Sequence, residues 1–356
     1  MFYHGKALNF LTLMYKNCII LVIMRGSAHI YSNSGPKNGP YVKRNQKRSG
    51  SMLKYIAKRL VMAAVTIFTV ATLTFLLMNM IPGGPFNAEK ALTPQAKAAL
   101  EAKYGLDKPL SERYVTYMKG ALRLDFGDSL KQRGRTVMSI ITTKFPVSAR
   151  VALIAVSVAI LIGVPLGCIS ALNRGKLVDN VIIVGATCGI AIPSFVVCTV
   201  MLYVFGVYLK VLPTMGLATP ANYVMPVIGI AFYPTAYITR LMRSSMLDVL
   251  GQDYIRTAKA KGLSQVVQLF KHAMRNAILP VVTYVGPMLA YVLTGSFVVE
   301  KIFTVPGLGG EFIKCIQGQD YPVIMGTTIF LATIMVLMNV LVDVIYTIID
   351  PRIKLK

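Results

Sequence analysis

The chain has 356 residues, of which 55% are hydrophobic, and a formal net charge of +24. A chain of this length and apolar content is not expected to be a soluble domain. A helix that crosses a bilayer needs a run of about 20 apolar residues, and this composition is suited to such runs. The excess of Lys and Arg could suggest nucleic acid, but the positive charges concentrate in segments that would all lie on one side of a membrane. We therefore expect an all-α polytopic membrane protein embedded in a lipid bilayer, with no nucleic-acid partner.

The first 51 residues form an N-terminal extension. It holds a short apolar stretch at 8–24 and a polar, basic stretch at 25–51, and residues 52–60 then look like a fresh start into a membrane span. Two interpretations stay open: translation normally begins at Met52, which we favour, or the extension is a real extra anchor. A signal peptide is not expected, because no small-residue cleavage site precedes a soluble domain.

Six runs are apolar and long enough to cross the membrane. They are Leu60–Ile81, Val147–Leu172, Val181–Val207, Tyr223–Thr239, Ile278–Val299 and Val323–Ile349. Several contain proline, which membrane helices tolerate because neighbouring groups satisfy the freed backbone. We divide the rest of the chain into a first transmembrane helix at 52–81, an external segment at 82–146, and a five-helix core at 147–356 that contains a cytoplasmic loop at 244–277.

The distribution of Lys and Arg predicts the orientation. These residues are frequent before the first span, after the second, after the fourth and at the C-terminus, and rare in the opposite short loops. The positive-inside rule then puts both termini in the cytoplasm and residues 82–146 outside. Within that external segment, the pattern predicts a helix over Thr93–Tyr104, stopped by Gly105, and a second over Ser111–Leu122, which together form a small outer cap.

The loop after the fourth span contains the most informative stretch, a basic helix of about two turns. Asp253 is expected to cap its N-terminus, and Lys259 and Lys261 lie in its last turn, where the helix dipole favours cations. Gly262 can adopt the left-handed conformation that ends a helix. Such a helix offers a soluble partner a rigid surface, whereas the alternative is an ordinary basic loop that only fixes topology.

Residues Ser264–Ala277, which follow this helix, repeat apolar side chains at helical spacing opposite a polar and basic face. The pattern predicts an amphipathic helix in the membrane interface. His272 is expected to be an interfacial polar residue rather than a ligand, because no second His or Cys accompanies it. The five cysteines form no CxxC pair, so we expect no disulfide framework, no metal and no cofactor.

Asp343 is the one acidic residue well inside a span, and Asn339 lies on the same helical face. An intramembrane acid suggests a functional site by default. Pairing with a basic residue at the interface is the interpretation we favour, and a role in a transport pathway is the alternative. Tyrosines in the spans could also line a polar path, although interface belts and packing explain most such residues. They are Tyr203, Tyr233, Tyr237, Tyr284 and Tyr291.

Missing motifs exclude several functions. The sequence has no Gly-x-x-x-x-Gly-Lys-Ser/Thr motif, so it is not expected to be an enzyme that hydrolyses nucleotides. The spans contain no His and only one well-buried acid, which argues against a membrane Ser–His hydrolase and a paired-aspartate protease. A stand-alone secondary transporter should carry several buried charges and internal repeats. It stays as an alternative of another class, as does a membrane-anchored assembly or sensor protein.

A series of short motifs runs through residues 52–356 in order. They are Lys58-Arg-Leu with Phe75-Leu-Leu-Met-Asn-Met-Ile-Pro82-Gly-Gly-Pro85, Tyr104-Gly-Leu-Asp-Lys-Pro-Leu, Leu124-Asp-Phe-Gly-Asp-Ser129, Ile192-Pro-Ser-Phe195, Leu212-Pro-Thr214, Thr239-Arg-Leu-Met-Arg-Ser-Ser-Met-Leu247, Val299-Glu-Lys-Ile-Phe-Thr-Val-Pro-Gly-Leu-Gly309, Asp320-Tyr-Pro322 and Asp350-Pro-Arg352. Together they resemble the oligopeptide-permease B type, the inner-membrane permease subunit of peptide/nickel ABC importers.

The resemblance implies six transmembrane helices of the type I ABC importer permease class. It implies a binding-protein-dependent importer driven by ATP, in the bacterial inner membrane, that takes oligopeptides or dipeptides. Nickel-chelate and glutathione importers share the pattern and remain alternatives. The implied partners are a second homologous permease subunit, two cytoplasmic ABC ATPase subunits, an extracytoplasmic substrate-binding protein and the peptide itself.

The resemblance also gives the basic helix a role in coupling to an ATPase. The implied coupling residues are Asp253, Tyr254, Arg256, Thr257, Ala258, Lys259, Ala260, Lys261, Gly262 and Leu263. Arg256-Thr-Ala258 stands where the general pattern has Glu-Ala-Ala, and the family glycine corresponds to Gly262. The helix would sit in a groove of one ATPase subunit and convert its closure into rocking of the spans.

Overall fold

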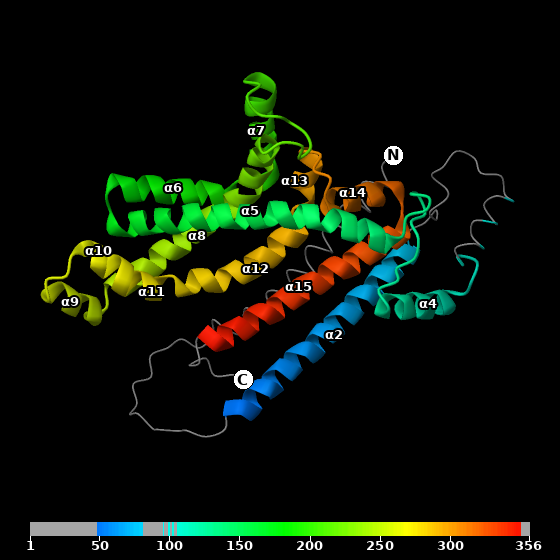
Figure 1. Ribbon diagram of the computed structural model, residues 1–356, viewed down its shortest axis with the longest axis horizontal. Helices are drawn as coiled ribbons and strands as arrows, with labels where there is room; N and C mark the ends of the chain where they lie inside the picture. Colours follow the sequence, from blue (N-terminus) through cyan, green and yellow to red (C-terminus); the bar gives the residue numbers. More distant parts are fainter. Residues whose placement is uncertain (1–47, 81–94, 96–98, 100–101, 103–104, 350–356) are drawn as a thin grey trace. The chain divides into compact units, whose positions relative to one another are not determined.

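The computed structural model describes residues 48–80, 95, 99, 102 and 105–349. Contacts divide the chain into Met1–Leu53 and Lys54–Lys356, and the fold below is that of the second unit. Its described part consists of helices and connecting turns without a named β-strand, which confirms the all-α class (Figure 1). Most of the N-terminal extension, most of the predicted helix Thr93–Tyr104 and the motif Asp350–Arg352 lie outside the described residues.

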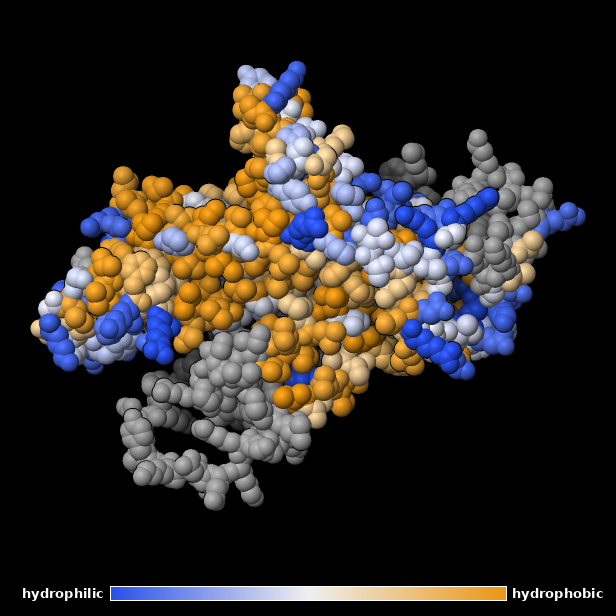
Figure 2. All heavy atoms as spheres, in the orientation of Figure 1, coloured by the Kyte–Doolittle hydropathy of each residue, from blue (hydrophilic) through white to orange (hydrophobic). Residues whose placement is uncertain are grey.

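Five described helices are long and apolar enough to cross a membrane, or six spans if one bent pair is counted as a crossing. The five lie in α2 (Arg48–Met80), α5 (Val137–Leu172), α8 (Ala221–Leu250), α12 with α13 (Leu279–Gly295 and Phe297–Ile302) and α15 (Tyr321–Ile349). Figure 2 shows apolar side chains over this helical body and hydrophilic ones gathered near α9 and near α4. This distribution suits a polytopic membrane protein.

The run Val181–Val207, predicted as one continuous span, is broken. α6 (Leu177–Ala191) ends at Ile192. The next segment, in which α7 (Ser194–Met201) continues into the π-helical η1 (Leu202–Tyr208), is bent by 101° relative to α6. Pro193 has no backbone N–H, and a residue before proline is pushed out of the helical region. Ile192 accordingly adopts φ −81° and ψ 123°, which ends α6.

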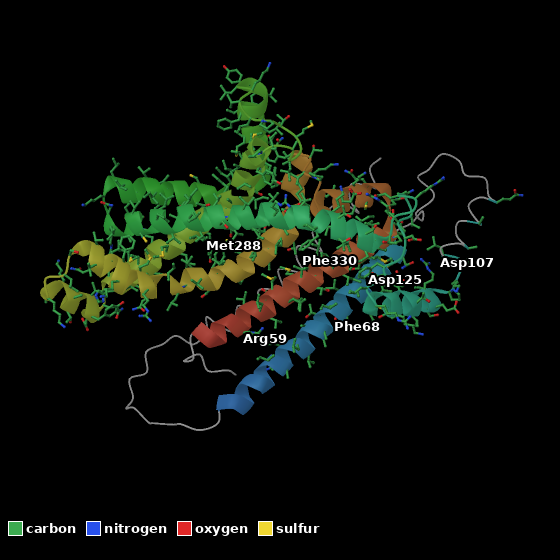
Figure 3. All side chains as sticks on the ribbon, viewed as in Figure 1. Arg59, Phe68, Asp107, Asp125, Met288 and Phe330 are labelled. Atoms are coloured by element: carbon green, nitrogen blue, oxygen red, sulfur yellow. The ribbon has the colours of Figure 1, made fainter. Side chains whose placement is uncertain are left out.

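The core is built around α8, which packs along α5. Small residues allow the backbones to approach closely, as is common between membrane helices. A Cβ atom on Gly167 of α5 would lie 2.6 Å from Cβ of Met242, and one on Gly189 of α6 would lie 2.7 Å from Cβ of Ala236. Met288 of α12, labelled in Figure 3, belongs to the same buried cluster. α8 is therefore fixed against three neighbouring helices.

The described part of residues 82–146, the segment predicted to be external, packs on α2. α4 (Leu110–Leu122) matches the predicted helix Ser111–Leu122 to one residue. The hydroxyls of Tyr114 and Thr72 lie 2.8 Å apart, and the Phe75 ring stacks on that of Tyr117 with centroids 5.6 Å apart. Burial of Tyr117 raises the pKa of its phenol.

Two of the sequence motifs, Leu124–Ser129 and Asp320–Pro322, meet at the start of α15. Ser129 Oγ donates to the Asp320 carboxylate, and the backbone N–H of Leu130 donates to Asp320 Oδ1 at 3.0 Å. Gln132 Nε2 donates to Glu311 Oε1 of α14 (Leu308–Gly318) at 2.6 Å. These contacts fasten residues 129–132 to the N-terminal ends of α14 and α15. We call them the outer clasp, after the side of the membrane that the sequence predicts for residues 82–146.

A third motif, Val299–Gly309, contains Glu300 of α13, whose carboxylate is buried. Ser296 Oγ donates to Glu300 Oε1 at 2.8 Å, and the N–H of Gly310 donates to Oε2 at 3.0 Å. Ser148 Oγ of α5 accepts from the N–H of Leu308 at 2.8 Å. These bonds satisfy backbone donors in the first turn of α14, which otherwise have no helical partner.

Candidate functional site: the loop between α8 and α12

The loop begins with α9 (Asp253–Ala260), a short helix that follows α8 after a two-residue turn. Ile255 and Ala258, three positions apart on one face, are its buried residues, while Arg256 and Lys259 are exposed. Helical spacing of i and i+3 places the two buried residues on the same side. α9 is thus held by one apolar face and presents a polar, basic face outward.

The N-terminus of α9 differs from the prediction by one residue. Gln252, not Asp253, is the N-cap, and its side chain makes no capping hydrogen bond. Asp253 instead begins the first turn, where a carboxylate is still favoured by the helix dipole. Its Oδ1 lies 3.6 Å from Nη1 of Arg256, but both side chains are largely exposed, so this ion pair contributes little stability.

The C-terminus of α9 closes in a Schellman motif. Gly262 N–H donates to the carbonyl of Lys259 at 3.0 Å, and Leu263 N–H donates to that of Ala258 at 3.4 Å. Gly262 has φ +74°, the left-handed conformation expected from the sequence. No atom lies within 4 Å of a Cβ added at Gly262, so backbone conformation and not crowding favours glycine there.

The chain then returns toward α8 through α10 (Gln265–Val267), η2 (Gln268–Ala273) and α11 (Met274–Ala277). Asn276 Nδ2 donates to the Tyr254 hydroxyl at 2.8 Å, and Gln268 Nε2 donates to the carbonyl of Leu263 at 2.6 Å. The first bond ties α11 to α9. The loop is therefore a folded unit with hydrogen bonds between its helices.

The amphipathic pattern predicted over Ser264–Ala277 is divided in the structure. Ala273 and Ala277 are buried in the core cluster, whereas Val266 and Phe270 are 65% and 62% exposed. A π-helical segment has a wider turn than an α-helix, so it shifts the faces of the residues on either side of it. One part of the apolar pattern anchors the loop, and the other is available to the membrane interface or to a partner.

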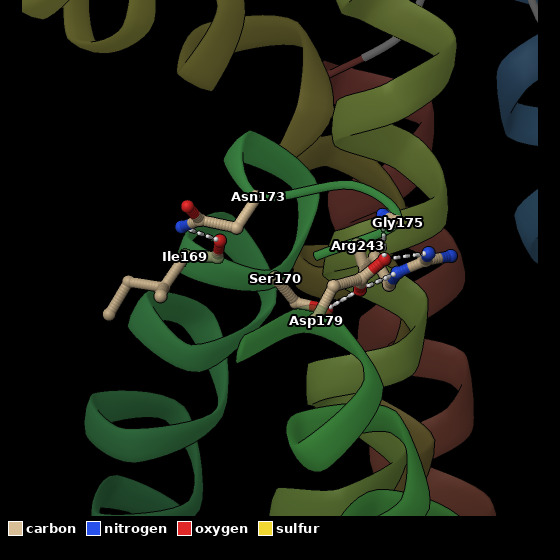
Figure 4. Close-up of polar contacts among 6 residues, drawn as sticks. All are labelled: Ile169, Ser170, Asn173, Gly175, Asp179 and Arg243. Atoms are coloured by element: carbon tan, nitrogen blue, oxygen red, sulfur yellow. Dashed lines mark hydrogen bonds and ion pairs between the residues drawn. The ribbon is translucent and has the colours of Figure 1, made fainter. Parts of the chain in front are cut away.

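The base of the loop is fixed by an ion pair that sequence reasoning missed. Arg243 of α8 makes a bidentate contact with Asp179 of α6, with Nε to Oδ1 at 2.7 Å and Nη2 to Oδ2 at 2.6 Å (Figure 4). Ser170 Oγ donates to Oδ1 at 2.5 Å and Gly175 N–H donates to Oδ2 at 2.9 Å. The four residues join the end of α5, the start of α6 and α8, and we call them the inner clasp.

The second predicted site, formed by Asn339 and Asp343, is described only in part. Asn339 is half-buried on α15. Asp343 lies in the same helix, but its side chain is outside the described residues, so its pairing stays a prediction. Among the residues that the structure describes, no group of three or more His, Cys, Asp or Glu side chains could hold a metal ion.

Comparison with known proteins identifies the family. The family described as "binding-protein-dependent transport system inner membrane component" matches residues 163–355, and its N-terminal counterpart matches residues 52–152. The dipeptide transport system permease protein DppB of Bacillus subtilis is 46% identical over 304 residues, 85% of this chain and 99% of that protein. The oligopeptide transport system permease protein OppB of Haemophilus influenzae is 40% identical over 305 residues, 85% and 100% of the two chains.

Among solved structures, a chain of the inward-facing MetNI methionine ABC transporter aligns with 60% of this chain and 97% of its own length, at a TM-score of 0.48 and 14% identity. That likeness is too weak to support the fold, which rests on the apolar helices and the family matches. The chain belongs to the binding-protein-dependent transport system inner membrane component family. It is a multi-pass inner-membrane permease subunit, and its family is not one of enzymes, as the sequence motifs indicated.

Proposed function

We propose that this chain forms half of the translocation pathway of an ATP-driven importer of dipeptides or oligopeptides. A second homologous permease subunit would form the other half, two ABC ATPase subunits would bind on the cytoplasmic side, and an extracytoplasmic binding protein would deliver the peptide. The identity of 46% and 40% to permeases named for dipeptide and oligopeptide transport supports this cargo. Nickel-chelate and glutathione import are the alternatives that an uptake assay must separate.

The observation that carries the proposal is the rigid attachment of α9 to the spans. Its Schellman end and the Tyr254–Asn276 bond fix the shape of the loop, and Ile255 belongs to the same buried cluster as Met242 of α8. The inner clasp then joins α8 to the ends of α5 and α6. ATPase subunits that close on ATP would push the exposed face of α9, and α8 would carry that displacement into the bundle as a rigid-body motion.

The arrangement of the two clasps supports the proposed orientation. The outer clasp lies at the N-terminal ends of α5 and α15, and the inner clasp lies at the C-terminal end of α5. Opposite ends of a spanning helix face opposite sides of a membrane. With the basic loop inside, as the positive-inside rule requires, the outer clasp and α4 face the binding protein, and both termini are cytoplasmic.

Uptake in a strain that lacks this chain tests the proposal. Labelled di-, tri- and pentapeptides, glutathione and nickel are supplied separately, with and without restoration of the chain. We expect the chain to restore peptide uptake, and removal of the ATPase subunits to abolish it. Restoration of nickel uptake alone would assign the importer to nickel chelates, and uptake that continues without the ATPase subunits would favour a secondary transporter.

A further inference from the structure

A polar stripe, exposed except at the half-buried Tyr237, runs along one face of α8. At 3.6 residues per turn, its members lie within an arc of about 80°. They are Tyr233, Tyr237, Arg240, Ser244 and Asp248. The exposed apolar residues Val224 and Ile228 of the same helix lie about 140–220° away from Tyr233, on the opposite side. α8 is also the least hydrophobic of the five spans, with a hydropathy of 1.2 against 1.5 to 2.6 for the others. The helix therefore has one face suited to lipid and one that is not.

Tyrosines of α12 extend the stripe. The Tyr237 ring stacks on that of Tyr284 with centroids 4.3 Å apart, and Tyr233 stacks on Tyr237 at 6.3 Å. Tyr291 lies on the same face of α12 as Tyr284, because seven residues make close to two full helical turns. Tyr233 and Tyr291 are 36% and 49% exposed. The four phenols form one surface shared by two spans.

The depth of this surface argues against an aromatic belt. The inner clasp marks the level at which α5 ends and α6 begins, because Arg243 contacts Asp179 there. The ten positions from Arg243 back to Tyr233 correspond to about 15 Å along the helix. Half of a hydrocarbon core is about 15 Å thick, so Tyr233 lies near the middle of the bilayer, where belt tyrosines do not lie. A phenol hydroxyl facing lipid at that depth would have no hydrogen-bond partner.

The stripe also borders a hollow of about 350 Å³, lined by Ile190, Tyr233, Tyr237, Arg240 and Leu241. Arg240 is exposed one turn deeper than the inner clasp. An ionisable residue at such a position usually faces a water-filled cavity and not lipid. The hollow thus combines stacked rings, hydroxyls that can donate or accept, and one guanidinium at its inner end.

We propose that this surface is the peptide-contacting wall of the translocation path. The hydroxyls of Tyr233 and Tyr291 hydrogen-bond the carbonyl and amide groups of the peptide backbone, the Tyr237 ring lies stacked between its neighbours, and Arg240 binds the terminal carboxylate. Contacts to the backbone do not depend on side chains, so a wall of this kind accepts peptides of varied sequence. This inference rests on the proposed function for its cargo, while the aqueous character of the stripe can be tested without it.

Thiol accessibility tests whether the stripe faces water. Cysteine is placed at Tyr233 or, as the matched control on the opposite face, at Ile228, in an otherwise cysteine-free chain within the complete complex. We expect a small water-soluble thiol reagent to modify Tyr233→Cys and spare Ile228→Cys, and trialanine delivered by the binding protein to slow the first reaction. Two unreactive positions would mean that lipid or the second permease covers the stripe, and would overturn the proposal.

Uptake of labelled trialanine by the reconstituted complex tests the contacts. The double variant Tyr233→Phe/Tyr291→Phe removes two exposed hydroxyls and keeps the rings, so we expect uptake to fall about tenfold, as loss of two hydrogen bonds would cause, while the loaded binding protein still stimulates ATP hydrolysis. Tyr203→Phe, an exposed tyrosine of η1 outside the stripe, should transport normally. Arg240→Gln should abolish the preference for trialanine over its C-terminal amide, and Arg240→Lys should retain it.

The outcomes separate this proposal from the proposed function. Wild-type uptake by the double Phe variant, or an unchanged preference in Arg240→Gln, would overturn the peptide-contacting wall. Loss of stimulated ATP hydrolysis together with uptake would assign the tyrosines a structural role and would overturn it as well. A wild-type complex that imports no trialanine would instead contradict the cargo in the proposed function, and the thiol result would still report whether the stripe faces water.

Discussion

Arg243 and Asp179, 64 residues apart in the sequence, form a bidentate ion pair at the end of the bundle from which the α8–α12 loop emerges. The Asp179 side chain is 2% exposed and that of Arg243 is 26% exposed. A carboxylate buried to this extent depends on its partners, because removal of one member leaves an uncompensated charge. The pair therefore helps to hold α8 against the ends of α5 and α6 that lie near the α8–α12 loop.

We predict that Arg243→Gln lowers the stability of the purified complex by about 3 kcal/mol, since breaking a buried pair costs on the order of 3–5 kcal/mol and Arg243 is partly exposed. Asp179→Asn in the same chain should recover part of that loss, because it removes the unpaired carboxylate. Thermal unfolding of Arg243→Gln, of Asp179→Asn and of the double variant measures the coupling between the two side chains. Arg174→Gln, an exposed base in the neighbouring turn, is the control and should change nothing. A double variant no better than Arg243→Gln would contradict this account.

Loss of the outer clasp should change the structure only at the end of the bundle opposite the α8–α12 loop. Asp320 is 1% exposed and accepts hydrogen bonds from Ser129 and from the backbone of Leu130. Asp320→Ala should leave these donors unsatisfied, at a cost of about 1–3 kcal/mol. Hydrogen exchange should increase at residues 126–136 and stay unchanged in α9. If exchange in Asp320→Ala increases no more at residues 126–136 than in α9, the clasp does not hold the external segment.

The proposed orientation predicts a labelling pattern in intact cells. Ser111 on α4 and Ser264 after α9 are both exposed, so a cysteine at either position is chemically accessible. An impermeant thiol reagent should modify Ser111→Cys and spare Ser264→Cys until the cells are opened. Cys18 and Cys188 are replaced by serine, whereas the buried Cys168, Cys198 and Cys315 can stay. Burial raises the pKa of the Cys315 thiol to about 12. Modification of Ser264→Cys in intact cells would reverse the orientation.

The sequence predicted those features that depend on local patterns. Apolar length located the spans, and a glycine after a basic last turn located the left-handed residue Gly262. The break at Pro193 was missed because membrane helices often accommodate proline, and only the neighbouring packing decides whether one bends by 101°. The inner clasp was missed because a contact between Asp179 and Arg243 leaves no periodic signal. The N-cap shifted from Asp253 to Gln252, a one-residue change that helix-end patterns do not resolve.

The proposed transmission of force through α9 depends on how that helix ends. Gly262 has φ +74°, and a β-branched residue is strongly disfavoured there, so Gly262→Val should disrupt the Schellman end and redirect the chain after Ala260. The spans should still fold, because their packing does not involve this turn, and membrane levels should be normal. Peptide uptake should be largely lost, with weaker co-purification of the ATPase subunits or ATP hydrolysis that no longer responds to loaded binding protein.

Gly262→Asn is the matched control for this change. Asn adopts the left-handed conformation far more readily than Val, and no atom lies within 4 Å of the added Cβ, so the end of α9 should be preserved. Most of the uptake should therefore remain in Gly262→Asn and disappear in Gly262→Val. Wild-type transport by Gly262→Val would mean that α9 is not the coupling element, and the loop would then act only in fixing membrane topology, as its basic residues alone would suggest.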